Sequence, residues 1–390
     1  MAEPDRAPSR PAAAARDLEP AIAATLARKA RVRDMPAYVP KDALEIGEAL
    51  RRLFAAHGET GEIKGIRRLA GGASKEQFVF DLARSAGAER MVLRMDPLES
   101  AVETSRLREY QMIRAASGIV PVPRPYFVDP DGGLLGAPGI VTGFVGGVAK
   151  PFNVTGARIS GLGTVFGPVW RARLKDEFVA RLVQIHRIDW TRADLDAFAP
   201  PLADPLQAAR WQVNWWARVW ADDMVEAAPI VALAERWLHE NLPSCTTPVI
   251  VHGDYRTGNF LFDEEAGHIT AILDWELCHL GDFHEDLAWV VQGIFGHPDD
   301  AGVHLAAGLM PRAEFLDAYE RGSGRSVDVR TLHFYEVLGV WKTLVLSIAT
   351  SVRAARNAHS HQDVLLSFLG MAGPRFAAEL CELLERGPVR

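Results

Sequence analysis

The sequence Val251-His-Gly-Asp-Tyr-Arg-Thr-Gly-Asn-Phe-Leu-Phe-Asp-Glu-Glu-Ala-Gly-His-Ile-Thr-Ala-Ile-Leu-Asp-Trp-Glu276 contains two short apolar runs separated by a polar turn at residues 263–268. This pattern predicts a β-hairpin. Asn259 opens the first strand and Asp274 follows the second, so antiparallel pairing makes these two residues neighbours. Asp254 lies just before the first strand and can reach a substrate placed over them.

The side chains around this hairpin suit phosphoryl transfer. Magnesium bound to ATP prefers hard oxygen ligands, which the Asn259 amide and the Asp274 carboxylate offer. The Asp254 carboxylate can orient a hydroxyl that accepts the phosphoryl group. The stretch therefore predicts a phosphoryl-transfer site that holds Mg²⁺ on ATP and orients an acceptor hydroxyl.

The overall composition excludes several classes of protein. The chain has 390 residues, 48% hydrophobic and 24% charged, which is ordinary for a globular protein. Its net charge of -7 argues against nucleic acid as a partner, because binding to phosphate backbones normally requires a basic excess. The three cysteines are far apart and form no CxxC pair, which favours reduced thiols in a cytoplasmic protein.

The hydropathy pattern predicts no membrane partner. An uninterrupted apolar run of roughly 18 residues is needed to cross a bilayer, and no run reaches that length. The longest candidate, residues 334–352, is interrupted by Glu336 and Lys342. The first 20 residues carry Glu3 and Asp5 and no apolar core, so we expect no secretory signal.

Secondary-structure patterns divide the chain into a strand-rich part and a larger helical part. Expected strands lie at residues 63–69, 78–82, 90–95 and 140–145. Expected helices lie at about 17–34, 41–56, 100–117, 178–188, 205–240, 283–295, 312–320, 330–356 and 361–386. This order predicts an α+β protein with two lobes and a cleft between them. The expected domains are an N-terminal arm and helix at 1–40, with a mobile arm at 1–16, a small lobe at 41–146 and a helical lobe at 147–390.

The pattern HGDxxxxN, followed by an apolar hairpin and a final Asp, resembles the catalytic core of the aminoglycoside phosphotransferase and choline kinase superfamily. These enzymes are distant relatives of protein kinases. His252, Gly253, Asp254, Asn259 and Asp274 occupy the fixed positions of the pattern. The resemblance implies a protein-kinase-like fold with a small, sheet-rich N-lobe and a larger, mainly helical C-lobe. It also implies that Asp254 is the catalytic base or hydroxyl-orienting group, and that Asn259 and Asp274 are magnesium ligands.

The resemblance further suggests how the small lobe binds the nucleotide. Val92 and Arg94 share one face of a predicted strand, where the kinase template has an apolar group against adenine and a lysine for the phosphates. Arg94 departs from that lysine, although a guanidinium can also bind phosphate. Lys75 is a second candidate cation. The predicted partner of Arg94 is Glu109, with Glu103 as the alternative.

Two further segments complete the predicted nucleotide site. Gly71, Gly72, Ala73 and Ser74 are small enough to let backbone amides approach the phosphates, although such a pair of glycines is often only a turn. The residues from Thr142 through Phe144 to Val145 are expected to connect the lobes and to offer backbone hydrogen bonds to adenine. The chain contains no GxxxxGK[ST] motif, which disfavours a P-loop NTPase.

Other charged residues near the hairpin have predicted roles. Arg256 is expected to neutralise charge on the phosphoryl group during transfer, against the alternative of a solvated surface arginine. Glu276 is a weaker candidate for assisting the metal. Acids and histidines also cluster after the hairpin, and we interpret the acids as helix caps and braces of the loop rather than as a second metal site. This cluster contains His279, Asp282, His284, Glu285 and Asp286.

The acceptor is suggested by a closer resemblance and by local charge. GGxS with VLR, a Trp-rich stretch near 205–240, HGDYRxGN, LDWE and LGD resemble the kinase-like domain associated with acyl-CoA dehydrogenases, which implies a hydroxyacyl-CoA acceptor. Residues 321–356 carry six basic and two acidic residues, which favours an anionic acceptor over a solvated helix face. The basic residues are Arg321, Arg325, Arg330, Lys342, Arg353 and Arg356.

Three functions follow from these observations. The first is an ATP- and Mg²⁺-dependent kinase of a small-molecule hydroxyl, with an anionic acceptor favoured. The second is an aminoglycoside phosphotransferase, which an acidic acceptor cleft would support because aminoglycosides are polycations. The third is a nucleotide-binding pseudokinase, suggested by Arg94 in place of the usual lysine.

Overall fold

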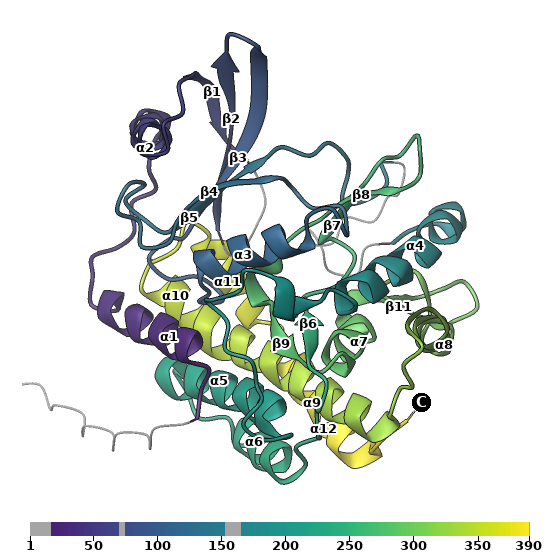
Figure 1. Cartoon of the computed structure of the whole chain (residues 1–390). Coiled ribbons are helices and arrows are strands. Elements are labelled where there is room, and N and C mark those ends of the chain that lie inside the picture. The colour runs from purple at the N-terminus through teal and green to yellow at the C-terminus, as the bar shows by residue number, and fades with distance from the viewer. Residues whose placement is uncertain (1–16, 70–74, 153–164, 390) are drawn as a thin grey trace, which may run out of the picture.

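The structure, a computed structural model, describes residues 17–69, 75–152 and 165–389 (Figure 1). A small lobe built on one sheet lies against a larger, mainly helical lobe, which is the predicted two-lobed α+β architecture. The mobile arm predicted at residues 1–16 lies outside the described residues.

The small lobe contains a five-stranded antiparallel sheet in the order β1-β2-β3-β5-β4. The first three predicted strands form β1, β2 and β3, and the fourth forms β5. The elements from the start of the described chain to the lobe junction are α1 (Pro20–Val32), α2 (Ala43–Ala56), β1 (Glu62–Arg68), β2 (Glu76–Arg84), β3 (Gly87–Met95), α3 (Arg106–Ala116), β4 (Pro125–Asp129) and β5 (Gly139–Gly143).

Alternation along β3 separates a core face from a cavity face. Met91, Leu93 and Met95 are fully buried and pack with the apolar side of α2. Val92 and Arg94 alternate with them and therefore point to the opposite face of the sheet, where they line a cavity. The prediction that Val92 and Arg94 share one face of the strand is thus confirmed.

Two boundaries in the small lobe differ from the predictions. The helix expected at 100–117 begins only at Arg106, because the Ser105 side chain accepts a hydrogen bond from the Arg108 backbone and caps the first turn. Strand β4 was not predicted, since Pro121, Pro123 and Pro125 before and at its start indicate an irregular segment. It lies at the edge of the sheet, where a missing backbone N–H is tolerated.

The larger lobe is helical apart from short strand pairs. The long helices predicted from 205 to 240 and from 361 to 386 are each divided, and in both cases a proline opens the second helix. The elements are α4 (Pro168–His186), α5 (Gln207–Asp223), α6 (Pro229–Glu240), β6 (Val249–Val251), β7 (Phe260–Phe262), β8 (Ile269–Ile272), β9 (His279–Gly281), α7 (His284–Val290), β10 (His297–Pro298), β11 (His304–Ala306), β12 (Met310–Pro311), α8 (Arg312–Ser323), α9 (Val329–Val345), the π-helical segment η4 (Leu346–Ser351), α10 (Val352–Arg356), α11 (Asp363–Gly370) and α12 (Gly373–Arg386).

The predicted hairpin forms as β7 and β8, which pair antiparallel. One further bond, from the Leu273 N–H to the Asn259 carbonyl at 2.7 Å, extends the pairing to the end next to Asp274. The hairpin also pairs with the segment that leaves the small lobe: Val148 and Phe262 exchange backbone hydrogen bonds of 2.9 and 3.0 Å. The same hairpin therefore positions the predicted metal ligands and anchors the lobe junction.

Two helical stretches have the length and composition of membrane spans, Val329–Arg356 and Val364–Arg386. Glu336 and Lys342 interrupt the apolar run of the first stretch, but the mean hydropathy of that stretch is still high enough for a membrane span. In that stretch, 72% of the most apolar window is buried inside the protein, as in a core helix; the corresponding share in the second is 22%. The absence of a membrane partner stays a prediction.

The N-terminal helix α1 packs against the larger lobe through Ile22 and Leu26. Beside them, the fully buried Asp223 carboxylate accepts hydrogen bonds from Lys29 at 2.5 Å, from Arg33 at 2.7 Å and from the Thr350 hydroxyl at 3.1 Å. Asp223 therefore ties α1 to α5 and η4. The domain limits at residues 40 and 146 stay a prediction.

We expect Asp223→Ala to lower the free energy of unfolding by about 3–5 kcal/mol, because it leaves the buried Lys29 without its counterion. Urea denaturation measures this loss. Glu240→Ala is the control, since Glu240 pairs with Arg236 on the surface and its removal should leave stability nearly unchanged. Equal stability of the two variants would contradict the role of the Asp223 cluster.

Candidate active site

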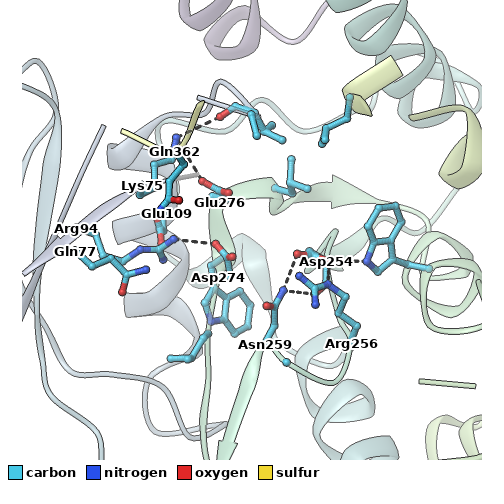
Figure 2. A pocket seen from close by; sticks show the side chains of 18 of the residues that line it. Lys75, Gln77, Arg94, Glu109, Asp254, Arg256, Asn259, Asp274, Glu276 and Gln362 are labelled. Atoms are coloured by element: carbon cyan, nitrogen blue, oxygen red, sulfur yellow. Dashed lines mark hydrogen bonds and ion pairs between the residues drawn. The ribbon is translucent and has the colours of Figure 1, made fainter. Parts of the chain in front are cut away.

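A cavity of about 750 Å³ lies between the two lobes (Figure 2). It gathers most of the residues predicted from sequence, whereas Gly71, Gly72 and Ser74 lie outside the described residues. The predicted residues that line it are Val92, Arg94, Glu109, Thr142, Phe144, Val145, Asp254, Arg256, Asn259 and Asp274.

Asp254 is held by three side-chain donors. Trp289 and Arg256 donate to its Oδ1 at 2.7 and 2.8 Å, and the Asn259 amide donates to its Oδ2 at 2.6 Å. These bonds fix the orientation of the carboxylate at the cavity wall, as a group that must meet an incoming hydroxyl requires. Trp289, which reaches Asp254 from α7, was not predicted as a site residue.

Arg256 lies directly beside Asp254, and its guanidinium also rests over the Phe295 ring, 5.2 Å from the centroid. The contact with an aromatic face and the bond to a carboxylate limit the side chain to the cavity wall. A cation held next to Asp254 can stabilise negative charge that develops on a transferred group.

Asn259 and Asp274 lie on the two neighbouring ends of the hairpin. Because a carboxylate can only accept, the bond to Asp254 identifies the Asn259 nitrogen, and Figure 2 shows the amide oxygen on the side toward Asp274. Asp274 adopts a left-handed conformation (φ 65°, ψ 57°), which is strained for a residue with a side chain. Two oxygen-bearing groups thus face one region of the cavity, as magnesium requires.

Arg94 joins the two lobes. Its guanidinium donates to Glu109 on α3 and, at 2.9 Å, to Asp274 Oδ1 (Figure 2). Burial alone would lower the pKa of Arg94, but the two carboxylates outweigh it and raise that pKa above its ordinary value. Glu103, the alternative partner, instead accepts a backbone hydrogen bond from Ser100 at 2.7 Å.

Behind Arg94 the charges continue as a buried network. Arg106, which is fully buried, contacts Glu109, and lies 3.2 Å from both Asp96 and Glu276. Lys75 lies 3.2 Å from Asp96 and 3.5 Å from Glu276. Glu276, proposed to assist the metal, is thus bound to two cations. Sequence reasoning missed Arg106 and Asp96, although Arg106 stands one helical turn before Glu109.

His252 and Asp286 hold the loop that carries Asp254. The Asp286 carboxylate accepts the backbone N–H groups of His252 and Gly253 at 2.7 and 2.9 Å, and contacts His186 Nε2 at 3.0 Å. The predicted bracing role is therefore what the structure shows. Gly253 has φ 80°, and a Cβ there would lie 2.6 Å from the Leu277 carbonyl, so this position requires glycine.

The His252 ring has one defined tautomer. Its Nδ1 accepts the Asp254 backbone N–H at 3.3 Å, which leaves Nε2 to carry the proton and donate to the Leu273 carbonyl at 3.1 Å. Burial lowers the pKa of His252, although the nearby Asp286 carboxylate opposes this shift. The neutral ring therefore connects the Asp254 loop to the residue that precedes Asp274.

The other members of the acid and histidine cluster form separate pairs. His279 Nε2 lies 3.0 Å from Glu285, and His284 Nδ1 lies 2.6 Å from Asp282, which also accepts the His284 backbone N–H. Burial alone would lower the pKa of His279, but Glu285 outweighs it and raises that pKa. Among the described residues, no group of three or more His, Cys, Asp or Glu side chains is arranged to hold a metal.

The side of the cavity that is predicted to hold adenine is largely apolar and lies at the lobe junction. Val92 and Thr142 are paired residues of β3 and β5, and both line the cavity. Phe144 and Val145 follow β5, line the same wall and lead to the backbone pairing at Val148. The segment thus connects the lobes as predicted.

The predicted basic wall is wrong. Of its six residues, all within the described chain, only Lys342 lines the cavity. Arg353 binds backbone carbonyls of Asp223 and Met224, and Arg325 lies over the Phe283 ring. Arg321 lies on α8 and Arg325 between α8 and α9, and the others are divided between α9 and α10, so the charge counted along the sequence does not gather on one surface.

A two-lobed fold with this set of side chains between its lobes is that of a kinase-like phosphotransferase. A family model described as "Phosphotransferase enzyme family" matches residues 65–335. Of the cavity residues named above, only Lys342 lies outside this range. The chain belongs to this phosphotransferase family. The predicted resemblance is confirmed.

The relatives found by sequence are acyl-CoA dehydrogenase family members. Family member 10 of Mus musculus is 27% identical over 255 residues, which cover 64% of this chain and 22% of that protein. Family member 11 of Rattus norvegicus is 24% identical over 292 residues, which cover 72% of this chain and 36% of that protein. The chain thus spans well under half the length of these relatives.

Solved structures share the fold. A putative aminoglycoside phosphotransferase from Ralstonia eutropha is 22% identical, with a TM-score of 0.64 and coverage of 88% of this chain and 99% of that chain. A thermostable mutant of an aminoglycoside phosphotransferase, in ternary complex with AMP-PNP and hygromycin B, is 16% identical, with a TM-score of 0.52 and coverage of 83% and 97%.

His252 gives a pH-dependent prediction. Because its pKa in the fold lies below the ordinary value of 6.5, the ring stabilises the protein fully above that value, and this stability is lost as pH falls through the folded pKa. We expect the stability difference between wild type and His252→Ala to shrink between about pH 8 and about pH 5. Urea denaturation at several pH values measures it. His279 is present in both proteins, so its contribution to the pH dependence cancels in the difference. A stability difference between wild type and His252→Ala that stays constant with pH would contradict the prediction.

Proposed function

We propose that this protein transfers the γ-phosphoryl group of ATP, with Mg²⁺, to a hydroxyl of a small molecule, and that the acceptor is a hydroxyacyl-CoA or another anionic acyl metabolite. One observation carries the proposal. Asp254 is fixed by three donors at the boundary between a charged half of the cavity, which contains Arg94, Asn259 and Asp274, and an apolar half.

The charged half suits a nucleotide with its metal. Asn259 and Asp274 would hold Mg²⁺ through oxygen atoms, and the ion would neutralise charge on the phosphates. Arg94 supplies a fixed cation for phosphate oxygens, and the apolar wall at Val92 and Phe144 suits a base. The solved relative that contains AMP-PNP supports this assignment, because it shares the fold.

Asp254 would act on the acceptor. A carboxylate held in one orientation can accept the hydroxyl proton while the oxygen attacks phosphorus in line with the leaving group. Arg256, bonded to the same carboxylate, would stabilise charge on the phosphoryl oxygens during transfer. The transfer is direct and needs no phosphorylated side chain.

The apolar half favours an acyl acceptor over an aminoglycoside. Its walls carry aromatic and aliphatic side chains from α7, the turn that follows it, α11 and α12, among them Trp289, Phe295, Leu365 and Phe376. Among the described lining residues, each carboxylate is already paired with an arginine: Glu109 and Asp274 with Arg94, Glu276 with Arg106 and Asp254 with Arg256. A polycation would find little negative charge to bind. The names of the acyl-CoA dehydrogenase relatives support an acyl acceptor.

We expect Asp254→Asn to lower phosphoryl transfer by roughly 100- to 10,000-fold, because the amide cannot accept the hydroxyl proton. Affinity for ATP, measured by fluorescence titration, should change little. Glu265→Gln is the matched control, since Glu265 is an exposed acid on the turn of the same hairpin. Undiminished turnover in Asp254→Asn would remove Asp254 from the mechanism, and magnesium-dependent ATP binding without turnover in wild type would indicate a pseudokinase.

An ATP-consumption screen tests the acceptor class. Hydroxyacyl-CoA thioesters and aminoglycosides are offered separately, and mass spectrometry detects the added phosphate. We expect the acyl thioesters to be phosphorylated, because the acceptor half is apolar and poor in free carboxylates. Phosphate on aminoglycosides and never on an acyl-CoA would overturn the proposed acceptor.

A further inference from the structure

Lys342 of α9, which is 3% exposed, is a buried cation that lines the acceptor half of the cavity. We infer that Lys342 positions the acceptor by binding a carbonyl or carboxylate oxygen that lies a few bonds from the reacting hydroxyl. This inference rests on the proposed function of the site and assigns the chemistry of its acceptor half.

The hydrogen-bonding capacity of Lys342 is largely unused inside the protein. Its Nζ lies 3.4 Å from the Gly253 carbonyl and 3.5 Å from Glu285 Oε1, both long for such contacts. By contrast, Lys29 lies 2.5 Å from Asp223, and Lys75 lies 2.8 Å from the Ser100 hydroxyl. An ammonium group removed from water needs strong partners, so Lys342 has donors to offer to a ligand.

Lys342 is also tied to the catalytic loop. Its Nζ lies 4.2 Å from the centroid of the Trp289 ring, whose indole N–H donates to Asp254. Its other neighbour, Gly253, immediately precedes Asp254. One residue on each side therefore links the ammonium to the carboxylate. An acceptor with its hydroxyl at Asp254 would present nearby atoms to Lys342.

The surroundings define the rest of the acceptor. Beyond Lys342, α9 passes into the π-helical segment η4, and Leu346 and Ser347 at its start line the cavity. Single π-helical turns often occur at functional sites. Leu365, Leu369 and Phe376 from α11 and α12 continue the wall. One cation beside apolar walls suits an aliphatic acyl compound with an oxygen near its hydroxyl.

The test compares acceptors as well as variants. Each protein receives a hydroxyacyl-CoA, the corresponding free hydroxy acid, and an aliphatic alcohol of the same chain length without the carbonyl group. The variants are Lys342→Met, which keeps the length of the side chain without its charge, and Lys342→Arg, which keeps the charge. Arg330→Met is the control, because Arg330 is an exposed cation on the same helix.

We expect Lys342→Met to lower kcat/KM for the hydroxyacyl-CoA and the hydroxy acid by about 10- to 100-fold, which corresponds to the loss of one hydrogen bond to a charged group. The kcat/KM for the plain alcohol should change little. Lys342→Arg should retain part of the preference, and Arg330→Met all of it. Preference for the thioester or for the free acid distinguishes a carbonyl from a carboxylate. An equal loss for every acceptor would overturn the inference, as would equal use of all three by wild type.

Calorimetric titration of the same three compounds into the ADP-bound protein measures acceptor affinity without turnover. Weaker binding of the hydroxyacyl-CoA or the hydroxy acid to Lys342→Met supports the inference even if no phosphate is transferred. In that case only the proposed function fails. Phosphoryl transfer without any effect of Lys342→Met on binding or kcat/KM overturns the inference alone. If Lys342→Met does not fold, the comparison of acceptors in wild type and Lys342→Arg decides.

Discussion

The ion pairs of Arg94 with Glu109 and Asp274 hold the small-lobe side and the large-lobe side of the site in one arrangement. Its guanidinium donates to Glu109 on α3 and to Asp274 after β8, so a strand of the small lobe is linked to the β7–β8 hairpin of the larger lobe. The guanidinium uses donors on two different nitrogens, one for each carboxylate, whereas an ammonium directs its three donors from one atom. Arg94 is therefore more than a substitute for the lysine of the kinase template: it binds an anchor and a predicted metal ligand at once.

A second set of contacts fixes Asp254 from the opposite side. Asp286 accepts two backbone amides of the loop, His252 links the loop to the end of β8, and Trp289 reaches Asp254 itself. The two bonds to Asp286 are buried, where an unpaired partner would be costly. The loop thus has little freedom to move Asp254 relative to Asp274. A rigid carboxylate beside a rigid cation suits a reaction in which positioning and charge stabilisation supply most of the catalysis.

Local patterns determined what could be predicted from the sequence. The hairpin follows from alternation and a polar turn, and the shared face of Val92 and Arg94 follows from the strand period of two. The pairing of Arg94 with Glu109 followed from a resemblance, and the structure brings the two together. The start of α3 depends on a capping bond of Ser105, and β4 forms because it occupies a sheet edge. Neither is visible in periodicity.

The acceptor half could not be predicted, because it depends on which face of a helix meets which neighbour. Counting charges over residues 321–356 suggested a basic wall, yet the fold turns five of the six cations away from the cavity and leaves Lys342 inside it. The carboxylate nearest to Lys342, Glu285, does not line the cavity and is also held by His279. On the cavity side, the charge of Lys342 is therefore not cancelled by its neighbour. The proposed preference for an anionic or carbonyl-bearing acceptor consequently rests on Lys342, a buried cation among apolar walls, where a charge acts more strongly than the same charge in solvent.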